Sequence, residues 1–322
     1  MATILVFVTA ADGAADKVSL QALTLGRELA AGGPVHALVI DDEAAAGGLG
    51  EWGATRVHLA RHPALDAGAT APDAWARILD DLATSLGAGI VLGPGTETGN
   101  TVVARAAARA GLPFAANCTA VAAGSPVTVT RVRWGGSLLE EATVHADRAM
   151  LTVAPHAIVA VATGGAASVE AFTPVLDDAD LAVRVVGTVP APTGGVSLAE
   201  AKVVVSGGRG AGSAEGFAPI VELAGLLGAA VGCSRAVTIA GWRPHTEQVG
   251  QTGTKIAPDL YIACGISGAT QHLAGCKGAK RILAINKDPE STIMSAADYA
   301  VIGDLHEVVP AISAEIRRVR GA

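Results

Sequence analysis

Residues 258–289 read PDLYIACGISGATQHLAGCKGAKRILAINKDP, and this stretch decides the fold of the second half of the chain. Leu260 to Cys264 is a short apolar run between a proline and a glycine, which is typical of a buried strand. From Ala269 the pattern is helical, and a second apolar run spans Arg281 to Ile285. The stretch therefore predicts a strand, a turn, a helix and a second strand. Free backbone N–H groups at the start of that helix would favour an anionic or electron-rich part of a ligand.

Polar side chains gather at the predicted start of this helix, namely Ser267, Thr270, Gln271 and His272. A lone histidine is usually a satisfied core or surface group, but His272 lies in the first helical turn. The helix dipole there favours anions and lowers the pKa of a histidine. Whether His272 is neutral or cationic stays open at this point.

A glycine-rich loop, GGRGAGS, follows the predicted strand Lys202 to Ser206 and precedes a predicted helix over residues 214–228. Strand, glycine loop and helix is an arrangement that binds phosphate, because glycines let the backbone approach an oxyanion. Arg209 adds a fixed cation inside the loop. The spacing is not the dinucleotide fingerprint, so Arg209 could equally be a surface arginine in a turn.

Ser234 and Arg235 follow the apolar stretch Ala229 to Cys233 and so fall at the carboxyl end of a predicted strand. Ligands bind at this end of α/β sheets. Taken alone, Arg235 would more often be an ordinary salt-bridge residue. Residues 241–258 hold too many glycines, prolines and polar residues for a regular element, and long loops of this kind in compact domains are usually functional.

Together these stretches resemble the alpha subunit of the electron transfer flavoproteins, the half of a heterodimer that holds most of the FAD contacts. The resemblance is clearest over residues 200–322. It rests on LYIACGISGATQHLAG (260–275), ILAIN (282–286), SGGRG (206–210), SR (234–235), QVGQTG (248–253) and GDL (303–305).

The resemblance implies a set of FAD contacts in this chain. They are Arg209, Ser234, Arg235, Val249, Gly250, Gln251, Thr252, Ser267, Gly268, Ala269, Thr270, Gln271, His272, Asn286, Asp304 and Leu305. It places Arg209 near the pyrophosphate and Arg235 over the flavin ring, where a permanent positive charge favours the reduced flavin. It also implies that Thr252 lies near flavin N5 and that His272 donates to flavin O2. The last three residues of the set are expected at the adenosine end.

An electron carrier is the function that this resemblance implies. Such a chain would take single electrons from a flavin dehydrogenase, such as an acyl-CoA dehydrogenase of fatty acid oxidation. It would pass them to the membrane quinone pool through a dedicated oxidoreductase. A beta subunit would complete the flavin pocket and bind AMP. The sequence shows no nucleophile beside a base and no metal-ligand cluster, which fits a carrier without substrate chemistry of its own.

Two alternatives stay open. The chain could belong to an electron-bifurcating flavoprotein that oxidises NADH with a second flavin. It could also be a nucleotide-binding module without redox work.

The first half of the chain alternates strands with helices, which predicts a mostly parallel sheet with right-handed crossovers. The expected strands are 3–9, 35–40, 57–60 and 89–92, and the expected helices are 15–31 and 73–86. From residue 127 the pattern changes. VTVTRVRW and SLLEEATV flank Gly135-Gly136, which predicts an antiparallel hairpin at the sheet edge, and residues 149–153 are a further candidate strand.

The loop GPGTETGNT, residues 93–101, ends a predicted strand and opens a helix that runs to Gly111. It could cradle phosphate, but it matches neither a P-loop nor the dinucleotide fingerprint, and Thr98 would serve as an N-cap. In the family that the sequence resembles, this domain is not the flavin site.

A chain of 322 residues is long for a single core, which favours two domains. The segment GTVPAPTGGVSLAEA, residues 187–201, has the composition of a linker. We therefore expect two α/β domains. Residues 1–190 would form a mostly parallel sheet with helices and an antiparallel edge hairpin, provide subunit contacts and hold no flavin. Residues 191–322 would form a doubly wound FAD-binding domain.

The composition excludes several classes of protein. The net charge is -7, with 23 basic and 30 acidic residues, which argues against nucleic acid as a partner. No apolar segment approaches the roughly 18 residues that a membrane span needs, so the chain should not insert into a membrane. The start, MATILVFVTAADG, lacks the basic region of a signal peptide, and a cytoplasmic location is expected. The four cysteines, Cys118, Cys233, Cys264 and Cys276, form no CxxC pair and are expected to be small buried hydrophobes.

Overall fold

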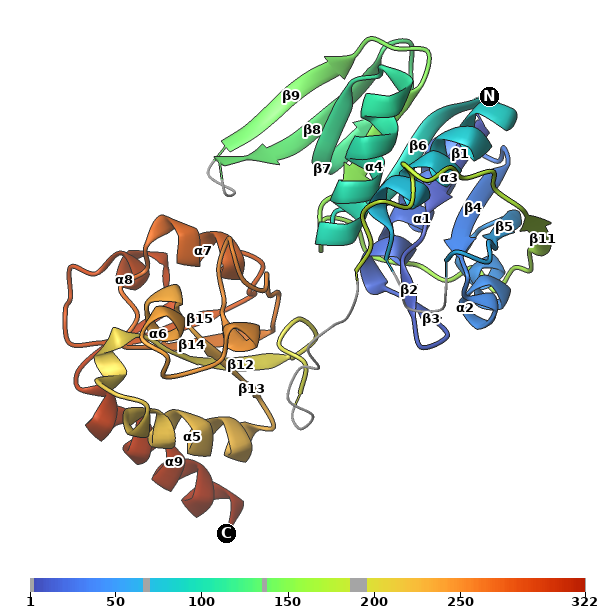
Figure 1. Ribbon diagram of the computed structural model, residues 1–322. Coiled ribbons are helices and arrows are strands. Elements are labelled where there is room, and N and C mark those ends of the chain that lie inside the picture. The colour runs from blue at the N-terminus through green and yellow to red at the C-terminus, as the bar shows by residue number, and fades with distance from the viewer. Residues whose placement is uncertain (1–2, 66–69, 135–137, 186–195, 322) are drawn as a thin grey trace. The chain divides into compact units, whose positions relative to one another are not determined.

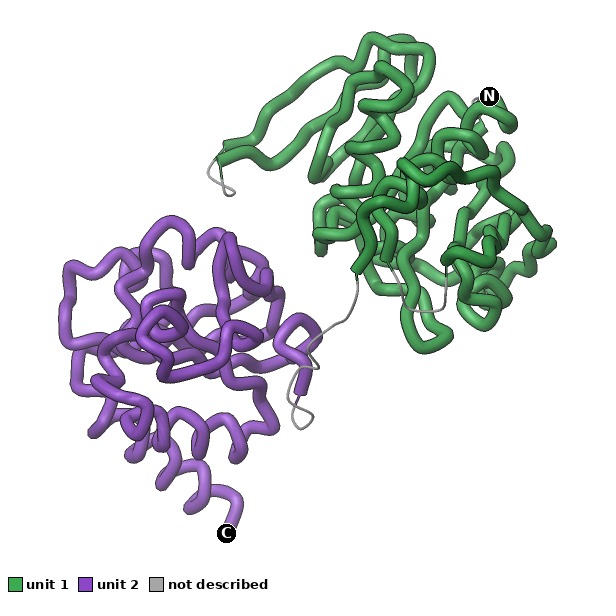
Figure 2. The backbone as a smooth tube through the Cα atoms, viewed as in Figure 1, with its two compact units in different colours: residues 1–134, 138–189 green, residues 135–137, 190–322 purple. Residues whose placement is uncertain are grey.

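The computed structural model describes residues 3–65, 70–134, 138–185 and 196–321, which form two compact units. Unit 1 falls within residues 1–189 and unit 2 within residues 190–322 (Figure 2). The expected hairpin turn at Gly135-Gly136 and most of the expected linker at 187–201 lie outside the described residues.

Unit 1 contains, within its described residues, a sheet of nine strands in the order β11-β5-β4-β1-β6-β10-β7-β8-β9 (Figure 1). The strands are β1 (Thr3–Phe7), β4 (Val35–Ile40), β5 (Arg56–Ala60), β6 (Ala88–Pro94), β7 (Phe114–Ala122), β8 (Val127–Arg133), β9 (Leu138–Val144), β10 (Ala149–Val153) and β11 (Ser168–Phe172). In this order, neighbouring strands from β11 to β7 are parallel to each other. Strand β8 is antiparallel to both of its neighbours, β7 and β9. The mostly parallel sheet with an antiparallel edge hairpin is thus confirmed.

Helices cover both faces of this sheet (Figure 1). One core lies between the sheet and the pair α1 (Lys17–Ala30) and α2 (Glu43–Gly48), and the other lies under α3 (Pro72–Ser85) and α4 (Glu97–Ala110). Helix α1 begins after Asp16, whose carboxylate accepts a hydrogen bond from Ser19 N at 2.8 Å. The shorter elements are the antiparallel pair β2 (Ala10–Ala11) and β3 (Ala14–Ala15) and the 3₁₀ turn η1 (Leu49–Trp52).

Three features of unit 1 differ from the sequence prediction. Residues 149–153 do form a strand, but β10 is inserted between β6 and β7, parallel to both, and every one of its residues is buried. Strands β7 and β11 were not predicted; β7 is rich in alanine, which has a low strand propensity. Helix α4 begins inside the glycine-rich loop, and its N-cap is Thr96 instead of Thr98, with Oγ1 accepting from Gly99 N at 3.1 Å.

Unit 2 contains, in its described part, a fully parallel sheet in the order β13-β12-β14-β15-β16. Its strands are β12 (Val203–Gly207), β13 (Ala230–Cys233), β14 (Leu260–Cys264), β15 (Ile282–Asn286) and β16 (Tyr299–Ile302). Numbered along the chain, this is the order 2-1-3-4-5 of a doubly wound sheet, so the predicted architecture is confirmed. The direction of winding reverses between β12 and β14, and such a switch point is where doubly wound sheets bind ligands.

The helices of unit 2 lie on both faces of its sheet (Figure 1). Helices α5 (Ala218–Leu227) and α9 (Leu305–Arg320) pack on one face, with Ile262 and Cys264 of β14. Helices α7 (Thr270–Cys276) and α8 (Thr292–Ala296) cover the other, with Tyr261 and Ala263. The remaining elements are α6 (Arg235–Ile239) and the 3₁₀ turns η3 (Arg209–Ala211), η4 (Glu215–Phe217) and η5 (His245–Glu247). The helix expected at 214–228 is thus η4 followed by α5, and α6 was too short to predict.

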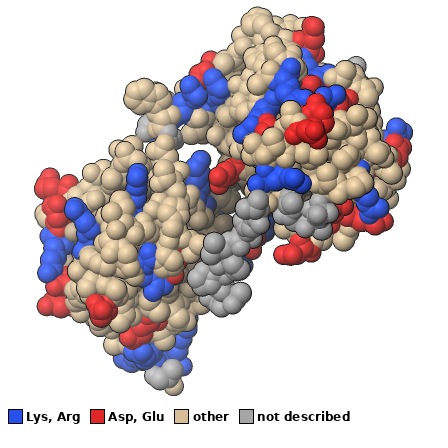
Figure 3. Space-filling model, in the orientation of Figure 1, with Lys and Arg blue, Asp and Glu red and all other residues tan. Residues whose placement is uncertain are grey.

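The surface and the cysteines agree with the composition. Acidic and basic side chains are interspersed on the visible face of each unit (Figure 3). All four cysteines are free and buried, as expected. None of the helices in the described chain has the length and apolar content that a bilayer crossing requires.

Candidate functional site

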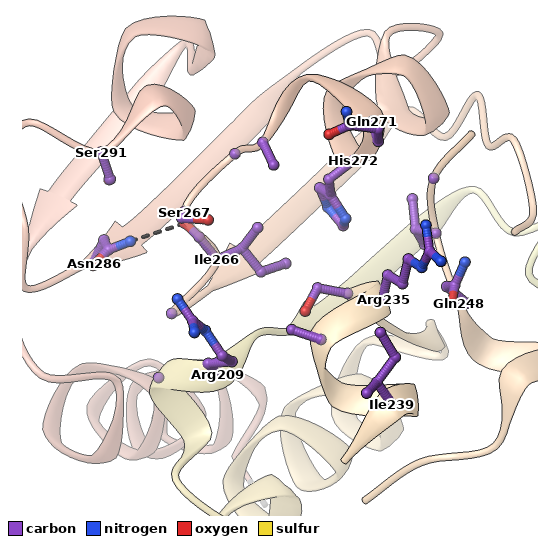
Figure 4. Close-up of a pocket in the computed structure, with 18 of the residues that line it drawn as sticks. Arg209, Arg235, Ile239, Gln248, Ile266, Ser267, Gln271, His272, Asn286 and Ser291 are labelled. Atoms are coloured by element: carbon purple, nitrogen blue, oxygen red, sulfur yellow. Dashed lines mark hydrogen bonds between the residues drawn. The ribbon is translucent and has the colours of Figure 1, made fainter. Parts of the chain in front are cut away.

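A cavity of about 430 Å³ opens at the carboxyl ends of the strands of unit 2 (Figure 4). Its walls are the segments that follow β12, β13, β14 and β15, together with the loop around Val249. The cavity therefore lies at the switch point between β12 and β14, where the fold itself predicts a ligand.

Most of the residues predicted to contact FAD line this one cavity. They are Arg209, Ser234, Arg235, Val249, Gly250, Thr252, Ser267, Gly268, Ala269, Gln271, His272 and Asn286. These residues come from five separate segments of the sequence, and the fold brings them together.

Four predicted residues lie outside the cavity wall. Gln251 and Thr270 are exposed beside it, and Gln251 N donates to Gln271 O at 2.7 Å. Asp304 and Leu305 instead line a smaller hollow of about 110 Å³, which shares Asn286 with the main cavity.

Asp304 and Leu305 have structural contacts of their own. Asp304 is the N-cap of α9, accepting from His306 N at 2.9 Å, and it pairs with Lys287 Nζ at 2.7 Å. The hydrogen bond from Lys287 holds the pKa of Asp304 below its usual value. Leu305 is buried in the core under α9. The two residues therefore anchor the start of α9 beside the smaller hollow.

The loops after β12 and β14 touch each other beneath the cavity. Gly208 N donates to Cys264 O at 2.9 Å, and Gly210 N donates to Gly265 O at 3.1 Å. A Cβ atom on Gly208 would overlap Gly265 O, so this close approach needs glycine. The contact sets the position of Arg209 between these two glycines, at the cavity wall.

Two arginines on the cavity carry positive charges without an acidic partner. Arg209 in η3 and Arg235 at the start of α6 both have exposed side chains, and neither forms an ion pair with a described residue. In contrast, Arg243 and Arg317 in the same unit pair with Glu247 and Glu222, each at 2.6 Å. The cavity therefore has positive charge available for an anionic ligand.

Gln248 is a cavity residue that sequence reasoning missed. Its side chain is 1% exposed; its Oε1 accepts from Thr238 Oγ1 at 2.8 Å and its Nε2 donates to Thr252 Oγ1 at 3.0 Å. With its oxygen accepting from Gln248, the Thr252 hydroxyl keeps its hydrogen for another acceptor. Gln248 begins the QVGQTG stretch quoted above, so membership of that stretch was the available signal.

The other missed residues are Gly210, Ala236, Ile239, Gly265, Ile266, Asp288 and Ser291. Asp288 and Ser291 gave no signal, because only the folded path of the segment after β15 brings them to the cavity. Asn286 holds that path: its Nδ2 donates to Ile266 O at 2.8 Å, drawn in Figure 4, and its Oδ1 accepts from Asp288 N at 3.1 Å. The Asn286 amide thus ties the ends of β14 and β15 together.

His272 is a second buried polar residue of the cavity, with 6% of its surface exposed. Its Nε2 lies 2.7 Å from Tyr261 Oη, and its Nδ1 is buried and has no hydrogen-bond partner among the residues described. Burial lowers the pKa of His272 to about 4; the Val249 backbone acts more weakly in the opposite direction, without reaching hydrogen-bond geometry to Nδ1. The ring is therefore neutral near pH 7, and burial, more than the helix dipole, is the cause.

Comparison with known proteins agrees with this geometry. The family model described as electron transfer flavoprotein domain matches residues 4–177, and the one described as electron transfer flavoprotein FAD-binding domain matches residues 197–277.

Several relatives match nearly the whole chain. The electron transfer flavoprotein subunit alpha of Mycobacterium leprae is 39% identical, with 100% of both chains covered. The protein of the same name from Bacillus subtilis is 36% identical, covering 96% of this chain and 95% of its own. Protein FixB of Clostridium saccharobutylicum is 36% identical, covering 98% of this chain and 97% of its own.

Proposed function

The chain belongs to the family of electron transfer flavoprotein alpha subunits, and we propose that it carries single electrons on an FAD held in the cavity of unit 2. The donors would be flavin dehydrogenases such as acyl-CoA dehydrogenases, and the acceptor a membrane oxidoreductase that feeds the quinone pool. A beta subunit that binds AMP would complete the site, and the complex would work in the cytoplasm. We assign FAD binding to residues 191–322 and subunit contacts to residues 1–190.

The proposal rests on the two arginines that line one cavity and form no ion pair with a described residue. FAD has a pyrophosphate with two negative charges and a ring that becomes more negative on reduction, so it suits two positive charges at separate points of one site. The buried Nδ1 of His272, which lacks a protein partner, also fits a ligand with acceptor atoms. The residues present therefore suit FAD.

Each of these side chains has a role that follows from its position. When bound, FAD supplies the ring system that accepts and releases electrons. Arg235 favours negative charge near it because its guanidinium group carries a positive charge. Thr252 has a hydroxyl hydrogen to donate, since its oxygen accepts from Gln248. Arg209 would hold the pyrophosphate, beside the backbone N–H groups of the turn after β12.

The proposal is tested by reducing the chain stepwise, without oxygen, after purification with its beta subunit. We expect a bound flavin in the purified complex. We expect Arg235→Ala to lower its first one-electron potential by about 60 mV, which corresponds to a tenfold loss of preference for the reduced form. The matched control is Arg317→Ala, which removes a paired surface arginine of the same unit and should leave the potential unchanged.

Other results would replace the proposal with a different function. A complex without flavin would favour a nucleotide-binding module that has no redox work. Reduction by NADH alone, through a second flavin, would favour an electron-bifurcating flavoprotein. An unchanged potential in Arg235→Ala would remove the role given to this arginine.

A further inference from the structure

Tyr261 and His272 form a buried polar pair beside the cavity, and the proposed function does not use the tyrosine. We infer that Tyr261 is a positioning residue that fixes His272 as the neutral tautomer with its hydrogen on Nδ1, so that the ring is a permanent hydrogen-bond donor to the cavity. The inference rests on the proposed function only for the identity of the ligand. The contact that we infer is a hydrogen bond from His272 Nδ1 to an acceptor atom of the ligand, such as a ring carbonyl oxygen.

The sequence of β14 brings the pair together. Successive strand residues point to opposite faces of a sheet, so Tyr261 and Ala263 share the face that α7 covers. His272 lies in the first turn of α7. The two ring centroids are 6.0 Å apart, and Tyr261 Oη lies 2.7 Å from His272 Nε2. Tyr261 is fully buried, so water cannot replace this contact.

The direction of this hydrogen bond follows from what surrounds the hydroxyl group. A buried hydroxyl hydrogen needs an acceptor, and His272 Nε2 is the acceptor that meets hydrogen-bond geometry among the described residues. Ser206 Oγ forms no hydrogen bond with any described group, so it does not compete for this hydrogen. Tyr261 therefore donates to His272, and Nε2 provides the lone pair.

Both members of the pair are uncharged at physiological pH. Burial raises the pKa of Tyr261 well above its usual value and lowers the pKa of His272 to about 4. A neutral imidazole that accepts at Nε2 must carry its hydrogen on Nδ1. A cationic ring would have hydrogens on both nitrogens and would leave the Tyr261 hydroxyl hydrogen without an acceptor.

The Nδ1 atom is the side of the ring that is left for a ligand. It is buried and unpartnered, and His272 lines the cavity, where Figure 4 shows its ring extending from α7 into the site. A ligand acceptor in the cavity would supply the missing partner.

This arrangement divides the work of the site between two kinds of group. Arg235 supplies a positive charge, and His272 supplies a neutral hydrogen-bond donor whose orientation Tyr261 sets. We therefore expect the donor to stay in place from about pH 5.5 to pH 8, since its pKa lies below this range.

The test is ¹⁵N NMR of the complete complex with labelled histidine, with the His272 signals identified by their loss in His272→Gln. We expect Nδ1 to have a pyrrole-type shift and Nε2 a pyridine-type shift throughout that pH range. In Tyr261→Phe the two shifts should move toward each other, and FAD affinity should fall about threefold to tenfold, the effect of one hydrogen bond. Tyr299→Phe, at a tyrosine that is 61% exposed, is the matched control and should change neither.

Each outcome decides the inference. A pyrrole-type Nε2 in the unchanged protein would overturn the tautomer, and this measurement does not require that Tyr261→Phe fold. Unchanged shifts and affinity in a folded Tyr261→Phe complex would overturn the role of Tyr261. A complex without FAD would defeat the proposed function, while the same spectrum would still report which nitrogen carries the hydrogen.

Discussion

In unit 1 the glycine-rich loop 93–101 joins the end of β6 to the start of α4, and in unit 2 the loop 207–213 runs from the end of β12 toward α5. The polar groups around the loop of unit 1 bond to each other. Thr152 Oγ1 accepts from Asn117 N at 2.9 Å and donates to Asn100 Oδ1 at 2.6 Å. Gly95 packs so closely that a Cβ atom would overlap Val153 O. The polar groups of Thr152, Asn117 and Asn100 therefore satisfy one another beside this loop.

The loop of unit 2 differs in what it leaves unsatisfied. Arg209 and Arg235 have no acidic partner among the described residues. His272 has a buried ring nitrogen, Nδ1, that forms no hydrogen bond with any of them. The same contrast holds for the buried histidines: in unit 1, His36 Nδ1 and His58 Nε2 bond to each other at 2.9 Å. The difference teaches that a glycine loop at a strand end marks a ligand site only where polar groups around it lack protein partners.

The largest expected effect comes from adding a methyl group at one tightly packed glycine in each unit, Gly268 after β14 in unit 2 and Gly95 in the loop of unit 1. Gly268 has a φ of +80°, and a Cβ atom there would overlap Ile293 N. We expect Gly268→Ala to lower the free energy of unfolding of unit 2 by about 4 kcal/mol, from left-handed strain and overpacking, and to release FAD. Gly95→Ala should lower that of unit 1 by about 3 kcal/mol and leave FAD bound.

Hydrogen exchange of peptides from β14 and β4 would measure the two units separately. Gly212→Ala is the control for backbone strain alone, because Gly212 has a φ of +79° with no atom near its Cβ position; it should lower stability by about 1 kcal/mol. Loss of FAD in Gly95→Ala with unit 2 still protected would contradict the comparison.

A smaller effect should appear on acidification. The pKa of His272 is about 4 in the folded chain and 6.5 for the free, solvent-exposed side chain, so the unfolded chain binds the proton first as the pH falls. The free energy of unfolding of unit 2 therefore has its full value above about pH 6.5. It falls by about 3 kcal/mol as the pH is lowered from 6.5 to 4. The nearby Tyr261 and Cys276 do not titrate in this range, since their ordinary pKa values lie above it and burial raises them further.

The measurement is hydrogen exchange of β14 at several pH values, corrected for the intrinsic rate. His272→Gln should remove most of the acid sensitivity of unit 2. The same substitution should not change the acid sensitivity of unit 1, where burial lowers the pKa values of His36 and His58. If hydrogen exchange of β14 depended equally on pH in the unchanged protein and in His272→Gln, His272 would not be the source of the acid sensitivity.

The sequence predicted most of the architecture, because strand and helix periodicities are local. It also predicted most of the cavity wall: Ser234 from its place at the end of a strand, and residues such as Thr252 and Asn286 from the resemblance to a family. It did not predict the hydrogen bonds beside loop 93–101, because Asn117 and Thr152 reach it from the separate strands β7 and β10. It missed the role of Tyr261 for the same reason: a strand residue looks like core until the helix residue that it contacts is known.

The smallest effect is expected from the network that closes the loop of unit 1. Thr152 is fully buried, and Thr152→Val keeps its shape while removing the hydroxyl that joins Asn117 to Asn100. Leaving these groups unsatisfied should lower the free energy of unfolding of unit 1 by about 1 to 2 kcal/mol, with FAD affinity unchanged. Urea unfolding followed by exchange of β10 peptides would measure this loss. If instead the variant gained affinity for a mononucleotide, the network would be what excludes a ligand from unit 1, and the two loops would differ by a single buried hydroxyl group.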